Sequence, residues 1–369
     1  MKIIVTGSQG FIGKNLCVYL KEKQHEVLEI HRETPQGDIV SILSQADFVF
    51  HLAGINRPLD PNEFKLGNVD LTRFIVDTLS DLNRDIPVVF TSSTQAEFDN
   101  DYGLSKLAAE KLIQSYSDIT GAASYIYRLP NVFGKWCNPN YNSFVSTFCY
   151  NVLNNINIKI NEPSKLVRLV YIDDVCSSFL KLLDGRAKTG FHKITPEFNT
   201  TVGEVADIIL SFKSSQTSLV TERVGTNLKR ALYSTYLSYT NPDQFNYSIP
   251  SYADERGVFC EMLKTKDSGQ FSFFTAHPGV TRGGHYHHTK NEKFLVIKGE
   301  AIFKFENIIT GKKHRLKVDC SNLEIIDTVP GWTHDITNIG NEDLIVMLWA
   351  NEIFDRNMPD TITRKLFEE

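Results

Sequence analysis

The sequence TGSQGFIG at residues 6–13 decides how the chain folds at its start. It follows a short apolar segment at residues 2–6 and precedes a stretch with helical spacing at residues 11–23. Glycines at such a junction let the backbone turn tightly and let a pyrophosphate approach the main chain, beside the free N–H groups of the helix start. We therefore expect a dinucleotide here, the alternative being a glycine-rich turn without a ligand. The predicted contacts are Gly7, Gly10, Phe11, Ile12 and Gly13.

Beyond this turn, short apolar runs alternate with longer stretches of helical spacing. Strands are expected at residues 27–31, 48–52, 88–91 and 124–129, and crossover helices at residues 64–82 and 102–117. Such alternation builds a parallel sheet that is covered by helices on both faces. We therefore predict an α/β domain over residues 1–243 with a doubly wound parallel sheet of the Rossmann type.

The texture of the sequence changes after a turn-rich segment near residue 243. Short β-rich runs follow, with Gly and Asn between them, at residues 271–276, 293–298, 301–306, 323–328, 335–338 and 344–349. Strands at this spacing, with few helical stretches among them, indicate a sandwich or barrel. We predict an all-β second domain over residues 250–369.

Length and composition fit this organisation. A chain of 369 residues suits two domains, since one domain takes roughly 150 residues. The formal charge of −5 makes nucleic-acid binding unlikely, and no apolar run is long enough to cross a bilayer. Without an apolar signal segment after Met1, a cytoplasmic location is expected. The six cysteines are scattered, which favours buried or indifferent thiols over a metal or redox site.

The segment after the second expected strand reads His31-Arg32-Glu33. A carboxylate at this point would hold the ribose hydroxyls of NAD, whereas the guanidinium of Arg32 can neutralise the 2′-phosphate of NADP. We therefore expect NADPH, with His31 and Arg32 as contacts. Glu33 leaves NAD open, and a solvated loop charge is the alternative for Arg32.

A candidate catalytic group follows the strand at residues 88–91. Tyr102 and Lys106 lie four residues apart on one helix face, so the ammonium is expected to lower the pKa of the phenol. The Ser93 hydroxyl would polarise a carbonyl, Tyr102 would exchange its proton, and Lys106 would also hold the nicotinamide ribose. This constellation predicts reduction or oxidation of a ketone or alcohol.

With these motifs, residues 1–240 resemble the extended short-chain dehydrogenase/reductase family. The resemblance implies cofactor contacts at Leu52, Ala53 and Gly54, and nucleotide-sugar contacts at Asn131 and Arg168. A surface salt bridge is the alternative for Arg168. Only eight residues separate Ser93 from Tyr102, which leaves Thr94 as a second candidate for the polarising role. The Asp-Glu pair of the family's dehydratases is absent, since Thr94 is followed by Gln and Ala.

A second constellation lies in the later domain. His285 and His287 are two residues apart on an expected strand and point to one face, and Glu292 and His334 can join them. Three imidazoles and a carboxylate suit zinc, nickel, manganese or iron. The motifs G-x5-H-x-H-x4-E-x6-G at residues 279–299 and P-G-x-x-H-x3-N at residues 330–338 resemble those of the cupin family. The alternative is a cupin pocket without metal.

Two further expectations concern neighbours of this constellation. His288 is expected to face solvent rather than to be a ligand. The segment at residues 254–261 resembles the entry strand of cupin-type sugar epimerases, so Arg256 and Glu261 either contact substrate or form a charged edge strand.

A reductase followed by a sugar-type cupin has a chemical logic. A 4-keto group acidifies the proton at C3, so inversion at C3 must precede reduction at C4. The pairing resembles a family of bacterial capsular polysaccharide synthesis enzymes. The resemblance implies a homodimer that converts a UDP-2-acetamido-2,6-dideoxy-4-hexulose to UDP-N-acetyl-6-deoxy-L-talosamine, on the route to N-acetyl-L-fucosamine. The expected cofactors are NADPH and a divalent metal, for which we favour zinc. The alternative is a single activity, with the cupin as a metal-stabilised association module.

Overall fold

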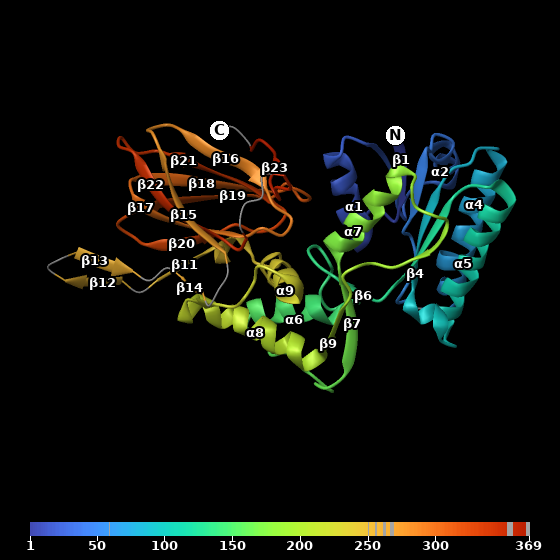
Figure 1. Cartoon of the computed structure of the whole chain (residues 1–369), viewed down its shortest axis with the longest axis horizontal. Coiled ribbons are helices and arrows are strands. Elements are labelled where there is room, and N and C mark those ends of the chain that lie inside the picture. The colour runs from blue at the N-terminus through green and yellow to red at the C-terminus, as the bar shows by residue number, and fades with distance from the viewer. Residues whose placement is uncertain are drawn as a thin grey trace. The chain divides into compact units, whose positions relative to one another are not determined.

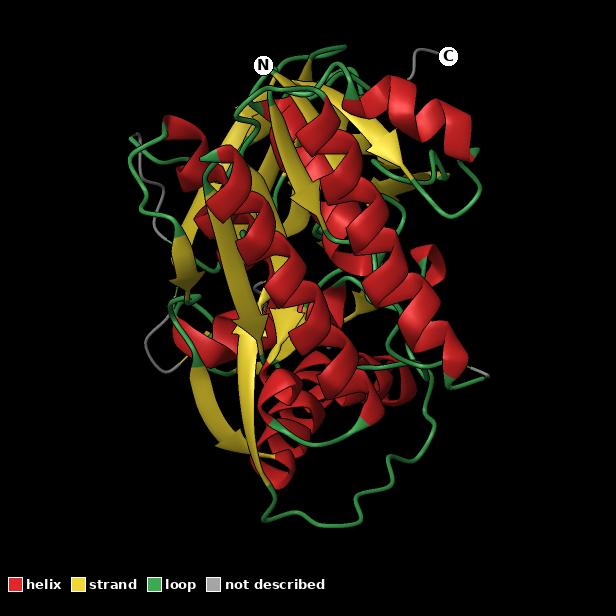
Figure 2. Cartoon of the chain, turned by 90° about the vertical axis from the view of Figure 1, so that its right-hand side faces the viewer, coloured by secondary structure: helices red, strands yellow, loops and turns green. Residues whose placement is uncertain are grey.

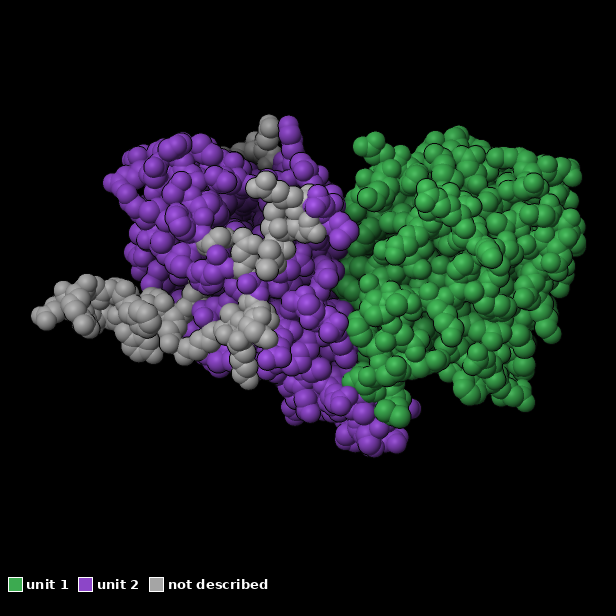
Figure 3. All heavy atoms as spheres, viewed as in Figure 1, with its two compact units in different colours: residues 1–143, 166–200 green, residues 144–165, 201–369 purple. Residues whose placement is uncertain are grey.

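The computed structural model divides the chain into two compact units (Figure 3). Unit 1 comprises residues 1–143 and 166–200, and unit 2 comprises residues 144–165 and 201–369. The structure describes the chain except Leu59, Pro250 and residues 255–256, 261–262, 266–268, 353–356 and 367–369. These units are defined by which residues pack together, and their bounds differ in kind from the predicted domain ranges 1–243 and 250–369, which stay a prediction.

Unit 1 is built on a six-stranded sheet with the order β2-β1-β3-β4-β5-β8. Every pair of neighbours is parallel, which confirms the doubly wound α/β prediction. The strands are β1 (Lys2–Thr6), β2 (Glu26–Ile30), β3 (Phe48–His51), β4 (Val88–Ser93), β5 (Ser124–Leu129) and β8 (Gly190–His192). Because β2 and β3 lie on opposite sides of β1, the strand order reverses there, and a crevice opens at the carboxyl ends of β1 and β3.

Helices cover both faces of this sheet (Figures 1 and 2). They are α1 (Phe11–Glu22) and α7 (Ile172–Leu180) on one face, and α2 (Gln36–Leu43), α4 (Leu71–Asp81) and α5 (Asp101–Thr120) on the other. Successive residues of β3 show the two layers. Val49 lies in the core with Leu79 of α4, whereas the ring of Phe50 packs 5.7 Å from that of Phe179 in α7. Each buried side chain of this size stabilises the fold by about 1.5–3 kcal/mol.

The helix expected at residues 64–82 is interrupted. The structure has a short α3 (Asn62–Phe64) and a π-helical turn, η1 (Lys65–Asp70), before α4 begins. The wider turn brings Asn68 inward, where its side chain accepts from the Ile55 N–H at 2.8 Å and donates to the Ser105 hydroxyl at 2.9 Å. Apolar periodicity does not register such a turn, so the prediction of one continuous helix is wrong here.

Unit 2 contains two antiparallel five-stranded sheets, with the orders β11-β20-β17-β22-β15 and β19-β18-β21-β16-β23. Their inner faces share one core that includes Phe294, Phe303 and Val346. The two packed sheets are consistent with the cupin prediction. The strands are β11 (Asn246–Ser248), β15 (Gln270–Ala276), β16 (Thr281–Tyr286), β17 (Glu292–Lys298), β18 (Glu300–Asn307), β19 (Lys313–Asp319), β20 (Glu324–Asp327), β21 (Trp332–Asn338), β22 (Leu344–Ala350) and β23 (Ile362–Thr363).

Three helices complete unit 2, namely α6 (Phe144–Leu153), α8 (Val202–Ser218) and α9 (Asn227–Leu237). Helix α8 begins with a capping box in which Thr201 and Glu204 satisfy each other's backbone N–H groups, which fixes its first turn. The remaining short elements of the two units are β6 (Asn131–Phe133), β7 (Leu166–Tyr171), β9 (Phe198–Thr201), β10 (Val220–Thr221), β12 (Ser251–Asp254), β13 (Gly257–Cys260), β14 (Lys264–Thr265), η2 (Thr94–Glu97), η3 (Lys181–Asp184) and η4 (Pro242–Gln244).

Two expectations from composition can be compared with the structure. Among the described residues, no helix is both long enough and apolar enough to cross a membrane. Of the cysteines whose side chains are described, Cys17, Cys137, Cys149 and Cys176 are buried free thiols and Cys320 is exposed. These positions agree with the expectation of buried or indifferent thiols.

Candidate functional site

The turn after β1 has no room for side chains. Gly7 has a φ of 67°, and a Cβ atom placed on it would lie 2.8 Å from Ala53 Cα. A Cβ atom on Gly13 would lie 2.2 Å from the carbonyl oxygen of Gly7. The Gly10 N–H donates to that same oxygen at 2.9 Å, and α1 begins at the next residue. Glycines therefore bring the start of α1 against the end of β1, where an anion meets unpaired N–H groups.

A cavity of about 600 Å³ opens beside this turn. Its walls come from unit 1 and include the carboxyl ends of β1, β3 and β4, as expected at the point where the strand order reverses. The predicted residues that line it are Gly7, Gly10, Phe11, Ile12, Gly13, Leu52, Gly54, Ser93, Tyr102, Lys106 and Asn131. Thr94 lines it too, so both candidates for the polarising hydroxyl stay open.

Four predicted contacts are not among the lining residues. Ala53 packs under the turn, and its N–H donates to the Thr6 hydroxyl at 3.1 Å. His31 and Arg32 follow the end of β2, and Arg32 is exposed. Arg168 is exposed in β7 and lies 3.6 Å from Glu197, the surface salt bridge foreseen as its alternative. Whether a bound ligand reaches these side chains stays a prediction.

Tyr102 lies in the first turn of α5, and Lys106 lies one turn later. The Lys106 ammonium donates to the Thr91 carbonyl at 2.9 Å and is buried. Burial lowers the pKa of Lys106 to about 8, and the nearby carboxylate of Glu110 opposes this change. The Ser93 hydroxyl accepts from the Gln95 N–H at 3.2 Å, which fixes it at the end of β4.

The expected lowering of the Tyr102 pKa is not seen. Burial raises the pKa of Tyr102, and a hydrogen bond with Ser93 opposes this change only in part. Lys106 does not lower the pKa of Tyr102, and its ammonium is bonded to the Thr91 carbonyl instead. A phenol with a raised pKa is protonated at neutral pH and can donate its proton to a developing alkoxide.

The sequence analysis missed the polar groups that support this end of the cavity. Buried His51 lies 2.8 Å from the hydroxyls of both Thr6 and Thr72, and burial lowers its pKa to about 3, so the ring is neutral. Asn68 fixes the Ile55 backbone, and its Oδ1 lies 2.9 Å from where a Cβ atom on Gly54 would be. The sequence offered one signal of this group, because Asn68 is a polar residue on the apolar face of the helix expected at residues 64–82.

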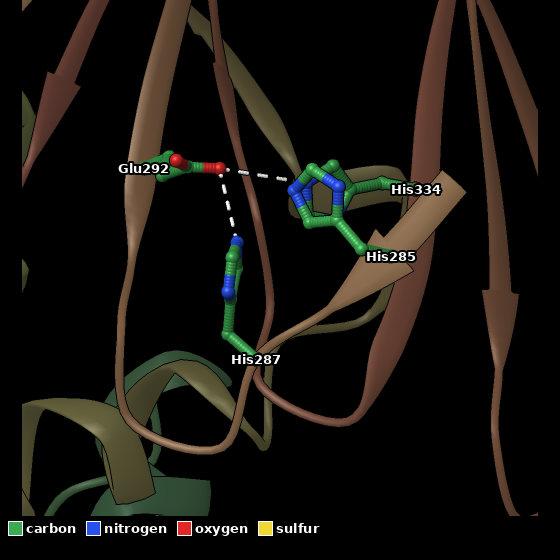
Figure 4. Close-up of side chains that lie close together, drawn as sticks. All are labelled: His285, His287, Glu292 and His334. Atoms are coloured by element: carbon green, nitrogen blue, oxygen red, sulfur yellow. Dashed lines mark hydrogen bonds and ion pairs between the residues drawn. The ribbon is translucent and has the colours of Figure 1, made fainter. Parts of the chain in front are cut away.

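The second constellation gathers inside unit 2 (Figure 4). His285 lies on β16, Glu292 begins β17 and His334 lies on β21, while His287 follows β16. One ligand atom from each of the four residues lies within 4.8 Å of the others. Glu292 Oε2 is 3.1 Å from His287 Nε2 and 3.5 Å from His334 Nε2. The four predicted metal ligands are thus brought together.

The chemistry of this cluster fits a divalent transition metal. Burial lowers the pKa of His285 to about 3 and also lowers that of His334, so both imidazoles are neutral at pH 7. Burial raises the pKa of Glu292, but hydrogen bonds from His287 and His334 outweigh it and hold the pKa well below its usual value. His334 Nε2 is buried and lies 3.5 Å from Glu292 Oε2. Neutral imidazoles and an ionised carboxylate are the states that such a metal needs.

Two expectations about this region need correction. His287 was expected on a strand with His285, but β16 ends at Tyr286, after a register shift between Gly283 and His285. His288 was expected to face solvent, but it is only 4% exposed. Both differences arise because residues near Asp360, which no cupin motif includes, cover this loop. Arg256 and Glu261 lie outside the described residues.

Comparisons with known proteins agree with both units. Residues 3–193 match the NAD dependent epimerase/dehydratase family, and residues 252–362 match the polysaccharide biosynthesis C-terminal domain. The chain is 54% identical over 98% of its length to a UDP-2-acetamido-2,6-beta-L-arabino-hexul-4-ose reductase of Pseudomonas aeruginosa, of which it covers 98%.

Solved structures give the same picture. The crystal structure of the capsular polysaccharide assembling protein CapF from Staphylococcus aureus is 38% identical, with a TM-score of 0.68, and the match covers 99% of this chain and 100% of that one. A UDP-glucose 4-epimerase of Thermus thermophilus in complex with NAD is 19% identical, with a TM-score of 0.51. That match covers 58% of this chain and 84% of the epimerase, and it shows the fold alone.

The tight turn after β1 generates a first prediction. Gly13→Ala forces a Cβ atom against the Gly7 carbonyl, so the turn must open, and NADPH affinity should fall by about tenfold or more. Gly37→Ala in α2 is the matched control, because a Cβ atom there meets nothing within 4 Å. Calorimetric titration of the full chain with NADPH measures both. Unchanged affinity in a folded Gly13→Ala variant would place the dinucleotide elsewhere.

Proposed function

The chain belongs to the NAD dependent epimerase/dehydratase family and, over its full length, to the CapF family of nucleotide-sugar reductases, and from this we propose a bifunctional enzyme. It acts on a UDP-2-acetamido-2,6-dideoxy-4-hexulose in capsular polysaccharide biosynthesis. Unit 2 inverts C3, and unit 1 then reduces the C4 ketone to give UDP-N-acetyl-6-deoxy-L-talosamine. The observation that carries the proposal is one chain with both a Tyr102-Lys106 pair in a dinucleotide-type cavity and a buried His-Glu cluster.

In the reductive step, the residues of unit 1 supply a proton to the substrate O4 and stabilise the negative charge that develops there. NADPH, when bound, supplies the hydride to C4. Tyr102, with its raised pKa, donates its proton to the O4 alkoxide as that charge develops. Ser93 supports the same oxygen, and Lys106 holds the nicotinamide ribose and balances the phenolate. Glycines 7, 10 and 13 receive the pyrophosphate, while Asn131 and Arg168 meet the nucleotide sugar.

The epimerisation comes first because the C3 proton is acidic only while C4 is a ketone. We propose that a divalent metal, zinc, is held by four side chains, those of His285, His287, Glu292 and His334. Such a metal supplies Lewis-acid stabilisation of an enolate oxygen. The cluster is supported from inside the sandwich, where the ring of Phe294 lies 6.2 Å from that of His334.

Two further parts of the proposal concern assembly and place. We propose a homodimer, because both families that the chain resembles commonly pair. We propose the cytoplasm as the location, because the sugar nucleotide and NADPH are used together there.

Replacing the proton donor tests the reductive step. Tyr102→Phe removes the hydroxyl, and NADPH oxidation with the 4-keto substrate should fall by about 10²- to 10⁴-fold. Tyr116→Phe on the same helix is the matched control, because its buried hydroxyl serves the Ile86 carbonyl instead, and it should retain parent activity. Absorbance at the NADPH band reports both rates. Full turnover by Tyr102→Phe would contradict the proposed role.

Cofactor choice is tested at the end of β2. Arg32→Ala removes a charged contact to the 2′-phosphate that is worth about 1.5–3 kcal/mol, so KM for NADPH should rise by about 10- to 100-fold. KM for NADH should stay at the parent value, because NADH carries no 2′-phosphate. Glu33→Ala is the neighbouring control, and it raises KM for NADH only if that carboxylate holds the ribose. Equal effects of Arg32→Ala on both cofactors would refute NADPH preference through this residue.

Deuterium exchange isolates the epimerase step in the full chain. Without NADPH, the parent protein should exchange the C3 proton of the 4-keto substrate for deuterium, and proton NMR detects the loss of that signal. His334→Ala should abolish exchange, whereas His277→Ala, at an exposed histidine paired with Asp343, should not change it. Tyr102→Phe should also exchange normally. A parent protein that reduces substrate but never exchanges C3 would favour a barrel that serves only in association.

A further inference from the structure

The cupin motifs leave one buried contact without a role. Residues 287–291, which we call the histidine loop, connect β16 to β17 and carry His287. Residues 357–366, which we call the C-terminal segment, follow the last long strand of the barrel and run against this loop. Asp360 of this segment lies 70 to 72 residues after the loop residues whose N–H groups it bonds, and no cupin motif includes it.

The carboxylate of Asp360 holds the backbone of the histidine loop. Its Oδ1 accepts from the His288 N–H at 2.9 Å. Its Oδ2 accepts from the N–H groups of Thr289 and Lys290 at 2.6 and 2.7 Å, and from the Thr289 hydroxyl at 3.0 Å. Three consecutive N–H groups that β pairing leaves open are thus satisfied by one side chain, which fixes the path of the loop.

The main chain of the same residue fixes the His287 ring. His287 Nδ1 is hydrogen-bonded to the carbonyl oxygen of Asp360. A carbonyl oxygen can only accept, so Nδ1 must carry the proton. Nε2, which lies 3.1 Å from Glu292 Oε2, is then the ring nitrogen that faces the cluster. It is therefore the nitrogen that would coordinate a metal held by these residues.

The C-terminal segment is itself anchored beside a second ligand. Ile362 and Thr363 of β23 pair with Tyr286 and His285 of β16. The Arg364 N–H donates to the Gly284 carbonyl at 2.8 Å, and its guanidinium reaches Glu306 at 3.2 Å. The C-terminal segment therefore contacts both β16, which carries His285, and the histidine loop, which carries His287.

Helix α9 holds the histidine loop through other atoms. The Ser234 hydroxyl donates to the Thr289 carbonyl at 2.9 Å, and the Arg230 guanidinium meets the Thr289 hydroxyl. These bonds leave the N–H groups of the loop and the His287 ring to the C-terminal segment. Asp360 and helix α9 share only the Thr289 hydroxyl, and the N–H groups of residues 288–290 and His287 Nδ1 are bonded by Asp360.

We propose that Asp360 is a positioning residue for the metal site, which sets the orientation and the tautomer of His287 through the C-terminal segment. The proposal rests on the proposed function, because it takes the His-Glu cluster to be a metal site. Asp360 does not touch the metal or the substrate. Its effect is to present Nε2 of His287 toward Glu292 before the metal arrives, so that little reorganisation accompanies binding.

The test measures metal affinity rather than turnover. The full chain is stripped of metal with a chelator and titrated with Zn²⁺ against a chromogenic competitor. Asp360→Ala should weaken Zn²⁺ binding by about 10- to 100-fold, the usual loss when a residue that orients a ligand is removed. With Co²⁺ as the probe, the visible absorption of the bound ion should change, because without the carboxylate the residue-360 carbonyl that meets His287 Nδ1 is held less firmly against the loop.

Asp319→Ala is the matched control. The Asp319 carboxylate accepts from the N–H groups of Ser321 and Asn322 at 2.8 and 3.2 Å in an exposed turn of the same barrel. Its loss should lower the melting temperature of metal-free and Zn²⁺-loaded protein equally. Asp360→Ala should instead narrow the gap between those two melting temperatures, because weaker binding stabilises less.

The outcomes separate the inference from the proposed function. Parent-like Zn²⁺ affinity in Asp360→Ala, or an equal loss in both variants, overturns the positioning role while C3 exchange and NADPH oxidation still report the proposed function. If Asp360→Ala does not fold, Asp360→Asn is used, which keeps one oxygen acceptor and should weaken Zn²⁺ binding in the same direction. Absence of Zn²⁺ and Co²⁺ binding by the parent overturns the metal site and the positioning role together.

Discussion

The close approach of the first helix to the first strand determines where the cavity of unit 1 lies. With Gly13 directly over the Gly7 carbonyl, the axis of α1 must start at the end of β1, and Gly7 must lie against Ala53 at the end of β3. These two approaches place the unpaired N–H groups of a helix start at the reversal of strand order. The cavity, and the position of Tyr102 and Lys106 on its wall, follow from that arrangement.

The sequence was informative wherever function and geometry depend on one local pattern. The glycine turn, the Tyr102-Lys106 spacing and the histidine spacing of the cupin motifs are each readable from a few neighbouring residues, and the structure brings each group together. The parallel sheet follows from alternating strands and helices. Most barrel strands follow from short β-rich runs, but β11, β19 and β23 are not among the expected strands, and the Lys, His and Arg residues of β19 conceal its pattern.

The features that escaped prediction depend on partners distant in sequence. Asn68 is turned inward by a π-helical turn whose advantage is its bonds to Ile55 and Ser105. His288 is buried because Asp360, more than 70 residues later, covers its backbone. Burial raises the pKa of Tyr102, and the Lys106 ammonium, which is bonded to the Thr91 carbonyl, does not offset this change. These contacts join residues that are far apart in the sequence, so the spacing of neighbouring residues does not predict them.

The placement of β23 has a consequence for biosynthesis of the protein. All four members of the His-Glu cluster are translated before Asp360, and each strand that carries His285, Glu292 or His334 has a partner strand earlier than β23, which adds a second neighbour to β16. A nascent polypeptide complete to residue 350 thus holds every ligand but lacks the carbonyl that meets His287 Nδ1. Orientation of His287 therefore comes after the ligands themselves, and translation of residues 357–366 is the step that completes the centre.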